Sequence, residues 1–389
     1  MKKLISILGS TGSIGLTTLR ILDLKKNYFI PYLFSADKNY NLICKQISKY
    51  KPVIFLINNQ KVYEKVKKKF KKHNTKIIKS LEKKHLKKNS DITVVAIPGI
   101  EGLVPTILMI KKSKKMLLAN KEAIICGWTL IKKIAHKIKT KIIPVDSEHF
   151  SISKLLEMHK LDEIKKIYLT ASGGPFLNFK LSQIKKVKPK DALKHPKWSM
   201  GKKISVDSAT LMNKILELIE AQKLFNIPMN KLDILIHPES LVHAILELKN
   251  GLKKFIYHET SMLIPLANAI FDNKVEIDSF LKPRKKIQNL NFKKVEKKIF
   301  PVIDIKKRIN EFPSTPIIIN AANEVLVDQF LRKNIQFLTI SLVLKKILRD
   351  RNYKNNAVKQ PNTINKINEI NNWAKKRTLE QLKQLKLYA

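Results

Sequence analysis

The sequence predicts an α/β protein: a Rossmann-like, doubly wound parallel sheet, then a central α+β domain, then a C-terminal α-helical bundle. Residues 3–24 read as strand, glycine turn and helix; apolar runs then alternate with helical patterns to about residue 145; beyond residue 150 the pattern becomes α+β. A chain of 389 residues is also too long for one ordinary core. The expected segments are 1–146, 147–271 with a flap near 195–201, a connector at 272–310, and a helical domain at 311–389.

The first strand, turn and helix are typical of a dinucleotide-binding βαβ unit. Residues 3–8 are apolar, the turn Gly9-Ser10-Thr11-Gly12-Ser13-Ile14-Gly15 follows, and residues 16–24 have a helical pattern. Such glycines let the backbone approach a pyrophosphate at the positive N-terminus of the helix. The spacing is G-x-x-G-x-x-G rather than G-x-G-x-x-G, so a plain tight turn stays the alternative.

The second strand, residues 29–35, ends where a bound dinucleotide would have its ribose read, at Ala36-Asp37-Lys38-Asn39. An acidic residue there favours NAD through the free 2′-hydroxyl, and a cation favours NADP through the 2′-phosphate. We favour NADP through Lys38, although Asp37 argues for NAD.

Strand and helix patterns continue to alternate along the first part of the chain. Further strands are expected at 53–57, 91–97, 116–119 and 141–145, with a lysine-rich helix after the first of them and a helix at 105–111. Open α/β sheets bind ligands beyond the carboxyl ends of their strands. Asn120-Lys121-Glu122 and Asp146-Ser147-Glu148 follow two such ends and are therefore candidate ligand contacts.

Two distant segments together predict a metal site. Asp146 and Glu148 are two residues apart, and in an extended segment this spacing turns both carboxylates to one side. Glu217 follows in a second segment, 205–217. If the segments meet, three carboxylates surround one point, and oxygen-only ligands suit Mg²⁺ or Mn²⁺.

The segment from Ser205 to Glu217 reads as a helix start, with Asp207 or Ser208 as its N-cap. The expected buried stripe is Leu211, Met212, Ile215, Leu216 and Ile219. Asn213, Lys214 and Glu217 share another face, because positions i, i+3 and i+4 are neighbours on a helix. The hydroxyl, amide and ammonium groups of this segment suit a phosphate.

The central part contains a second candidate ligand region. A strand at 167–171 leads into Ser172-Gly173-Gly174-Pro175, and the loop His195-Pro196-Lys197-Trp198-Ser199-Met200-Gly201 follows. We interpret this loop as a lid whose aromatic ring covers a ligand and excludes water. Later strands are expected near 233–236, 242–248 and 253–257, and helical patterns run from Asn320-Ala321-Ala322-Asn323-Glu324 to Leu387.

The net charge of +46 suggests a polyanion-binding protein at first sight. However, the lysines are dispersed, as at 83–88 and 293–298, and Lys, Ile and Asn share A/T-rich codons, so base composition accounts for the charge. Two cysteines without C-x-x-C fit a reducing compartment, and the first residues reach glycine too early for a secretion signal. We therefore expect a cytoplasmic protein with neither a membrane partner nor a specific nucleic-acid partner.

Six motifs resemble the 1-deoxy-D-xylulose 5-phosphate reductoisomerase family of the non-mevalonate isoprenoid pathway. They occur in order from residue 4 to about 324, and the block 195–214 is long and specific. The motifs are GSTGSIG at 9–15, LLANKEA at 117–123, PVDSEH at 144–149, SGGPF at 172–176, HPKWSMGKKISVDSATLMNK at 195–214 and NAANE at 320–324.

The resemblance implies a homodimer that rearranges 1-deoxy-D-xylulose 5-phosphate and reduces the product with NADPH to 2-C-methyl-D-erythritol 4-phosphate. Residues 1–146 would bind NADPH and 147–271 the metal and substrate.

The implied ligands of Mn²⁺, Mg²⁺ or Co²⁺ are Asp146, Glu148 and Glu217. The implied catalytic residues are Lys121, Glu148, His195 and Trp198. The implied substrate-binding residues are Lys121, Ser147, Glu148, Ser172, His195, Ser208, Asn213, Lys214 and Glu217. The implied cofactor contacts are Thr11, Gly12, Ser13, Ile14, Lys38, Asn39, Asn120, Glu122 and Gly201.

Some positions depart from the family's pattern. Asp37 and Ile215 stand where glycine is usual, Glu239 replaces glutamine, and Thr260-Ser261-Met262-Leu263 replaces Pro-Asp-Met-Arg. None of these changes removes an implied metal or phosphate ligand. Two alternative functions remain open from the residues alone: an NAD(P)-dependent dehydrogenase of another phosphorylated substrate, and a basic nucleic-acid-binding protein on an old enzyme fold.

Overall fold

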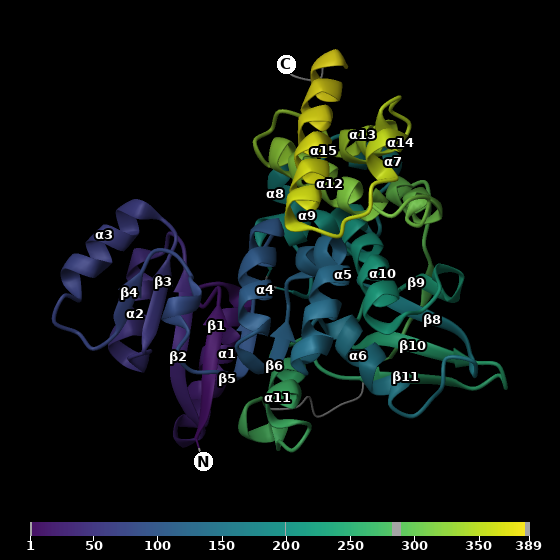
Figure 1. Cartoon of the computed structure of the whole chain (residues 1–389). Helices are drawn as coiled ribbons and strands as arrows, with labels where there is room; N and C mark the ends of the chain where they lie inside the picture. Colours follow the sequence, from purple (N-terminus) through teal and green to yellow (C-terminus); the bar gives the residue numbers. More distant parts are fainter. Residues whose placement is uncertain (1, 199, 282–288, 386–389) are drawn as a thin grey trace. The chain divides into compact units, whose positions relative to one another are not determined.

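A computed structural model describes residues 2–198, 200–281 and 289–385 (Figure 1). The described chain forms two compact units, each built from several segments. Unit 1 contains the described residues of Met1–Ala123, Leu130–Phe150 and Ser261–Arg284. Unit 2 contains those of Ile124–Thr129, Ser151–Thr260 and Lys285–Ala389. The domain boundaries expected from sequence stay a prediction, and part of the connector, 282–288, and the last residues, 386–389, lie outside the described residues.

Unit 1 contains a sheet of seven parallel strands within the described residues, in the order β4-β3-β2-β1-β5-β6-β7. The order reverses around β1, which is the topological switch point of a doubly wound sheet. The strands are β1 Lys3–Leu8, β2 Phe29–Ala36, β3 Ile54–Ile57, β4 Lys76–Ile78, β5 Ser90–Val95, β6 Ser113–Leu118 and β7 Lys141–Pro144. The strands expected from sequence are all present with slightly shifted ends, and β4 was missed because it has only three residues.

The inner strands are continuous apolar runs because helices cover both faces of such a sheet. β3 is buried along its whole length, and Ile5, Phe34 and Phe55 belong to one hydrophobic core. The helices that follow these strands in sequence are α1 Ser13–Leu24, α2 Tyr40–Tyr50, α3 Gln60–Lys69, α4 Leu103–Ile110, α5 Lys121–Ile138 and α6 Ser147–Leu156, and α11 Leu263–Phe271 comes later in the chain.

Helix α11 returns to unit 1 from far along the chain. Leu263, Leu266 and Ile270 join the core that contains Ile5. The buried Lys115 at the start of β6 donates hydrogen bonds to Ala269 O (2.9 Å), Ile270 O (3.0 Å) and the Asp272 carboxylate (2.9 Å). The lysine thus satisfies carbonyls at the C-terminal end of α11, where a cation is favourable.

Unit 2 contains a mixed sheet in the order β11-β10-β8-β9-β12. β8 pairs with β9 in parallel, and the other pairs are antiparallel. The strands are β8 Ile164–Ala171, β9 Leu232–Ile236, β10 Val242–Leu248, β11 Lys253–Tyr257 and β12 Lys293–Lys294. The helices of this part are α7 Leu181–Ile184, α8 Pro189–Ala192, α9 Lys202–Thr210 and α10 Met212–Phe225, and α10 packs on β8 and β9.

The C-terminal part of unit 2 is helical, as predicted. Helix α12, Thr315–Leu331, packs against α13, Phe337–Ile347, and α15, Ile364–Gln384, and α14, Tyr353–Ala357, contacts α15 (Figure 1). Short 3-10 helices connect the elements, at Lys26–Tyr28, Lys83–His85, Ile100–Gly102, Gly174–Phe176, Met229–Lys231, Ile277–Ser279 and Pro301–Arg308. The predicted fold class is therefore confirmed.

The expectation that Asp146 and Glu148 lie in an extended segment was wrong. β7 ends at Pro144, and α6 begins at Ser147. Asp146 Oδ1 accepts the backbone N–H of Glu148 (3.2 Å), and Asp146 O accepts that of Phe150 (2.8 Å). An aspartate before the helix and a glutamate in its first turn both favour a helix start, and this local preference decides the conformation.

The predicted cap at Asp207 or Ser208 was also wrong, because both residues lie inside α9. The break comes at Leu211, which has a left-handed backbone (φ 67°) between α9 and α10. The buried stripe is confirmed: Leu211, Met212, Ile215, Leu216 and Ile219 are all at most 1% exposed. The bend places Asn213 and Lys214 in the first turn of α10.

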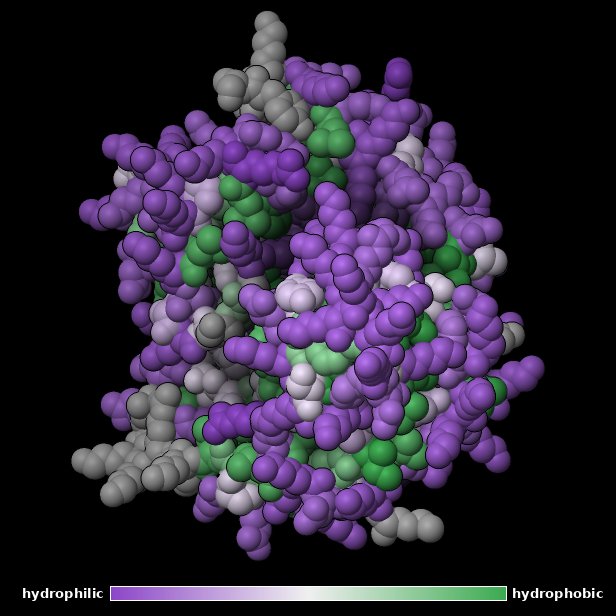
Figure 2. Space-filling view, turned by 90° about the vertical axis from the view of Figure 1, so that its left-hand side faces the viewer, coloured by the Kyte–Doolittle hydropathy of each residue, from purple (hydrophilic) through white to green (hydrophobic). Residues whose placement is uncertain are grey.

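The surface agrees with the dispersed charge of the sequence. On the face drawn in Figure 2, hydrophilic residues dominate and hydrophobic ones are scattered among them. Among the described helices, none combines the length and apolar character needed to cross a membrane. Cys44 and Cys126 are buried thiols.

Candidate functional site

The glycine-rich turn lies directly after β1, at the switch point of the unit 1 sheet. Gly9 has φ 86°, and a Cβ there would come within 2.6 Å of Ala96 O, so only glycine fits. Gly12 is exposed at the N-cap of α1 and has no side-chain cap. Thr11, Ser13 and Ile14 are exposed or half-buried around it. The positive end of α1 is therefore open to an anionic group.

A buried pair of side chains holds this turn, and no pattern in the sequence indicated it. Ser10 Oγ donates to Gln46 Oε1 (2.6 Å), and Gln46 Nε2 donates back to Ser10 O (3.0 Å). Both residues are at most 3% exposed. Gln46 lies on α2, so the helix after β2 fixes the turn after β1.

At the end of β2, Asp37 and Lys38 form an exposed ion pair with 4.0 Å between Nζ and Oδ2. Asn39 caps α2 by accepting the N–H of Leu42 (3.1 Å). The charges of Asp37 and Lys38 therefore lie where a dinucleotide-binding sheet contacts the 2′ substituent of the ribose, and both side chains are exposed to solvent.

Asn120 is almost fully buried and has a structural role that we did not predict. It caps α5 by accepting the N–H of Ala123, and its Nδ2 donates to the carbonyls of Ile97 and Gly99. Its side chain thus ties two loops at the carboxyl edge of the unit 1 sheet. A cofactor contact from Asn120 stays a prediction.

Asp146 is the centre of a polar network at the start of α6. Lys121 Nζ lies 3.3 Å from Asp146 Oδ2, and His149 Nδ1 lies 3.1 Å from Asp146 Oδ1. Ser147 Oγ donates to Glu148 Oε2 (2.6 Å). Because a carboxylate only accepts, the His149 contact places the proton on Nδ1.

One carboxylate oxygen each of Asp146, Glu148 and Glu217 lies within 4.8 Å of the others. Glu217 is 1% exposed and accepts from Asn213 Nδ2 and from Lys214 Nζ (2.5 Å), which confirms the shared helix face. Three carboxylates at this spacing repel one another, and a divalent cation bound by oxygen ligands relieves that repulsion. These residues are thus a candidate metal site of the predicted composition.

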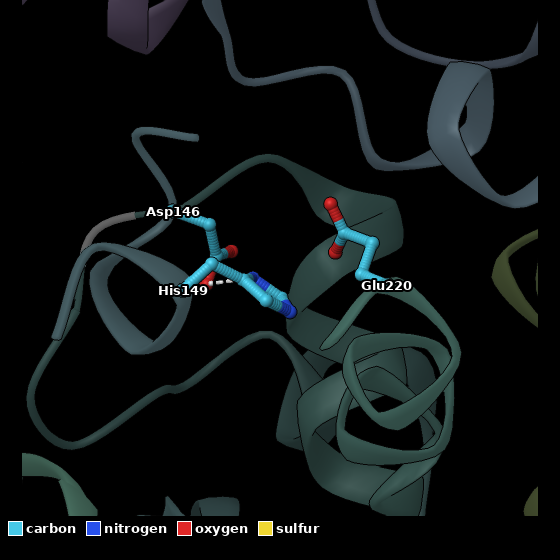
Figure 3. Close-up of side chains that lie close together, drawn as sticks. All are labelled: Asp146, His149 and Glu220. Carbon is cyan, nitrogen blue, oxygen red and sulfur yellow. Dashed lines mark hydrogen bonds and ion pairs between the residues drawn. The ribbon is translucent and has the colours of Figure 1, made fainter. Parts of the chain in front are cut away.

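A second group with the same spacing consists of Asp146, His149 and Glu220 (Figure 3). Asp146 belongs to both groups, and its Oδ1 is hydrogen-bonded to the His149 ring in this arrangement. We interpret His149 as a residue that orients Asp146, since carboxylates that bind metals are themselves usually held by hydrogen bonds.

In unit 2, Ser172 follows β8 and is constrained by two donors. Its Oγ accepts the Gly174 N–H (3.1 Å) and lies 3.0 Å from His195 Nε2. His195 Nδ1 accepts the backbone N–H groups of Lys197 (3.2 Å) and Trp198 (2.9 Å), so the ring proton must be on Nε2 and must point at Ser172. With both lone pairs used, the Ser172 hydroxyl has its own proton available for donation to another group.

Burial, and after it the positive charge of Lys214, lowers the pKa of His195 to about 4. The ring is therefore neutral at physiological pH, which keeps Nδ1 an acceptor. Its loop also carries the half-buried Trp198, whose ring centroid lies 6.1 Å from that of His243. Ser199 lies outside the described residues, and the lid role of the loop stays a prediction.

Ser172 lies beside a pocket in unit 2 with a volume of about 530 Å³. Phe176, Asn178, Lys194 and Lys197 also line it. Gly174 packs on α9: a Cβ there would come within 3.0 Å of Ser208 O and 3.1 Å of Ala209 Cα. The turn after β8 and the helix that carries Ser208 are thus in direct backbone contact.

Sequence models of one family match most of the chain. The matches are 1-deoxy-D-xylulose 5-phosphate reductoisomerase over residues 5–127, its C-terminal domain over 142–225, and a DXP reductoisomerase C-terminal domain over 259–377. A 1-deoxy-D-xylulose 5-phosphate reductoisomerase of Pelagibacter ubique (strain HTCC1062) is 43% identical over 96% of this chain and 97% of its own. One from Clostridium novyi (strain NT) is 37% identical over 93% of this chain and 95% of its own.

Solved structures agree. A DOX-P reductoisomerase in complex with NADPH, fosmidomycin and magnesium matches with a TM-score of 0.91 and 29% identity over 99% of both chains. The reductoisomerase of Zymomonas mobilis in complex with NADPH matches with a TM-score of 0.87 and 28% identity over 98% of this chain and 99% of that one.

Proposed function

The chain belongs to the 1-deoxy-D-xylulose 5-phosphate reductoisomerase family, and we propose that the residues described above carry out that family's reaction. The enzyme converts 1-deoxy-D-xylulose 5-phosphate to 2-C-methyl-D-erythritol 4-phosphate in isoprenoid precursor synthesis, with NADPH as the reductant. The observation that carries the assignment to these residues is the group of three carboxylates, Asp146, Glu148 and Glu217, which offers oxygen ligands only.

NADPH would lie against the turn after β1, with its pyrophosphate at the N-terminus of α1. Lys38 and Asn39 would read the 2′-phosphate at the end of β2, and Lys38 would supply the opposite charge. Further contacts are proposed from Thr11, Gly12, Ser13, Ile14, Asn120, Glu122 and Gly201. The exposed, uncapped start of α1 supports this arrangement.

The carboxylates Asp146, Glu148 and Glu217 would hold Mg²⁺, Mn²⁺ or Co²⁺. When bound, the ion supplies Lewis-acid polarisation of the substrate's carbonyl and hydroxyl oxygens. Around it the protein's own groups position the substrate: Lys121, beside Asp146, and Ser147, beside Glu148, would face the reacting end. Asn213 and Lys214 hold Glu217 and add donors for the substrate.

The substrate's phosphate would be bound by hydroxyl donors and by Lys214. Ser172 is well suited, because its lone pairs are occupied and its proton is available for donation. Ser208 follows on α9, which is in backbone contact with the Ser172 turn. His195 and Trp198 would close over the ligand and exclude water.

Two further properties are proposed from the family. We expect a homodimer, and we expect the enzyme in the cytoplasm, where two buried thiols, Cys44 and Cys126, would stay reduced.

The deciding test follows NADPH absorbance at 340 nm with purified protein and 1-deoxy-D-xylulose 5-phosphate. We expect oxidation of NADPH that stops with EDTA and returns with added Mn²⁺ or Mg²⁺. Absence of turnover at any metal concentration would refute the assignment of the reaction to this chain. Turnover that persists in EDTA would refute the proposal that Asp146, Glu148 and Glu217 hold a metal needed for the reaction.

A further inference from the structure

A buried hydrogen bond joins the C-terminal helices to α9. Asn323 on α12 donates from Nδ2 to Asp207 Oδ1 at 2.7 Å, across 116 residues of sequence. Asn323 is 0% exposed and Asp207 is 1% exposed. The other carboxylate oxygen of Asp207 lies 3.1 Å from Lys203 Nζ, one turn earlier on α9. A buried carboxylate persists only with such partners, so this bond is specific rather than incidental.

The amide orientation is determined by Asp207. A carboxylate can only accept, so Asn323 must present Nδ2 to it. In the described part of the chain this leaves Asn323 Oδ1 buried without a hydrogen-bond partner. The Asn323 amide therefore donates a hydrogen bond to Asp207, while its own oxygen accepts none from the described residues.

Asp207 immediately precedes Ser208, and the same turn of α9 is also in contact with Gly174. A Cβ at Gly174 would come within 3.0 Å of Ser208 O. The part of α9 that carries Ser208 is thus in contact with both the Ser172 turn and α12. Ser172 lies on the turn after β8 and Ser208 lies on α9. A shift of α9 relative to that turn therefore changes the distance between the two hydroxyl donors.

We propose that Asn323 is a positioning residue for the substrate phosphate, acting through Asp207 to fix Ser208 relative to Ser172. The proposal rests on the proposed function, in which these two hydroxyls bind the phosphate. It predicts that disturbing the Asn323–Asp207 bond weakens substrate binding while changing NADPH binding little. The dinucleotide turn belongs to unit 1, and Gly201, the one proposed cofactor contact on α9, is at the other end of that helix from Asp207.

The test is a charge swap, measured by NADPH oxidation after turnover of the wild type has been established. N323D puts a carboxyl group against Asp207, where the pair either repels as two anions or shares a proton. The kinetic constants are therefore measured at the alkaline end of the assay's pH range, where the repelling form is favoured. We expect the KM for 1-deoxy-D-xylulose 5-phosphate to rise by about tenfold or more, while the KM for NADPH stays within about twofold. The double variant D207N/N323D restores a complementary pair, because the amide introduced on α9 can donate to the carboxylate introduced on α12. Its substrate KM should return to within about threefold of the wild type.

N371D is the matched control. Asn371 is also a buried asparagine of the C-terminal helices (4% exposed), on α15, with Nδ2 bonded to Asn372. We expect N371D to lower the melting temperature without changing either KM.

If N323D does not fold, N323A, which only removes the donor, replaces it with the same expectation of a raised substrate KM. A substrate KM that is unchanged in the folded single variant, or one that stays raised in the double variant, overturns the proposal. A wild type without turnover refutes the proposed function instead.

Discussion

Replacing Ser172 with alanine tests the phosphate site most directly. In the wild type, Ser172 Oγ accepts from Gly174 N–H (3.1 Å) and from the His195 ring (3.0 Å), which leaves its own proton available to a ligand. Ser172→Ala removes that donor and leaves His195 Nε2–H without its acceptor. A hydrogen bond to a charged group contributes about 1.5–3 kcal/mol, and about 1.4 kcal/mol corresponds to a factor of ten. We therefore expect the substrate KM to rise roughly 10- to 100-fold.

The assay is initial-rate NADPH oxidation at saturating cofactor, with Ser172→Thr as the control that keeps a hydroxyl. A contact made equally in the ground state and the transition state raises KM and leaves kcat nearly unchanged. Ser172→Thr should recover most of the loss. The reasoning fails if Ser172→Ala has a substrate KM within about twofold of the wild type, or if the KM for NADPH rises as much as that for the substrate.

Three further predictions concern other parts of the site. Glu217→Gln should weaken the apparent affinity for Mn²⁺ by on the order of 100-fold and abolish turnover at low metal, because an amide replaces a buried carboxylate ligand; an unchanged Mn²⁺ titration would contradict this. Asp37→Gly should lower the KM for NADPH roughly 3- to 10-fold and raise the preference for NADPH over NADH, since it removes a negative charge near the 2′-phosphate; equal effects on both cofactors would contradict it. Because the pKa of His195 is lowered in the native state, the unfolded chain binds a proton at this ring below about pH 6.5, whereas the native state binds it only below about pH 4. Stability of the wild type should therefore fall relative to His195→Gln by about 1 kcal/mol between pH 7.5 and pH 5 in urea titrations, because solvent around the half-buried ring reduces the full linkage value of about 2 kcal/mol. A constant difference would show that the native state does not shift the titration of His195.

The sequence predicted the parts of the fold that are encoded locally. Apolar runs separated by helical patterns indicated the parallel sheet, and the glycine turn was correctly expected directly after the strand at residues 3–8. The Glu217 face was predicted because helical spacing fixes which residues are neighbours.

The parts that were not predicted depend on competing or distant interactions. Asp146-Ser147-Glu148 was read as extended, but the aspartate caps a helix that starts at Ser147. The bend between α9 and α10 occurs at Leu211, and leucine carries no signal for a left-handed backbone. The Asn323–Asp207 bond joins residues far apart in sequence, so no local pattern indicates it.

The contact at Gly174 has a consequence for how this enzyme can change during evolution. Its φ is +64°, and the atoms that a new Cβ would meet are the Ser208 carbonyl and Ala209 Cα, which are the same whatever side chains α9 carries. Exchanging side chains on α9 therefore removes neither these close contacts nor the left-handed backbone strain of alanine at position 174. A selection for second-site revertants of Gly174→Ala should return glycine at 174 itself, while suppressors within α9 should be absent.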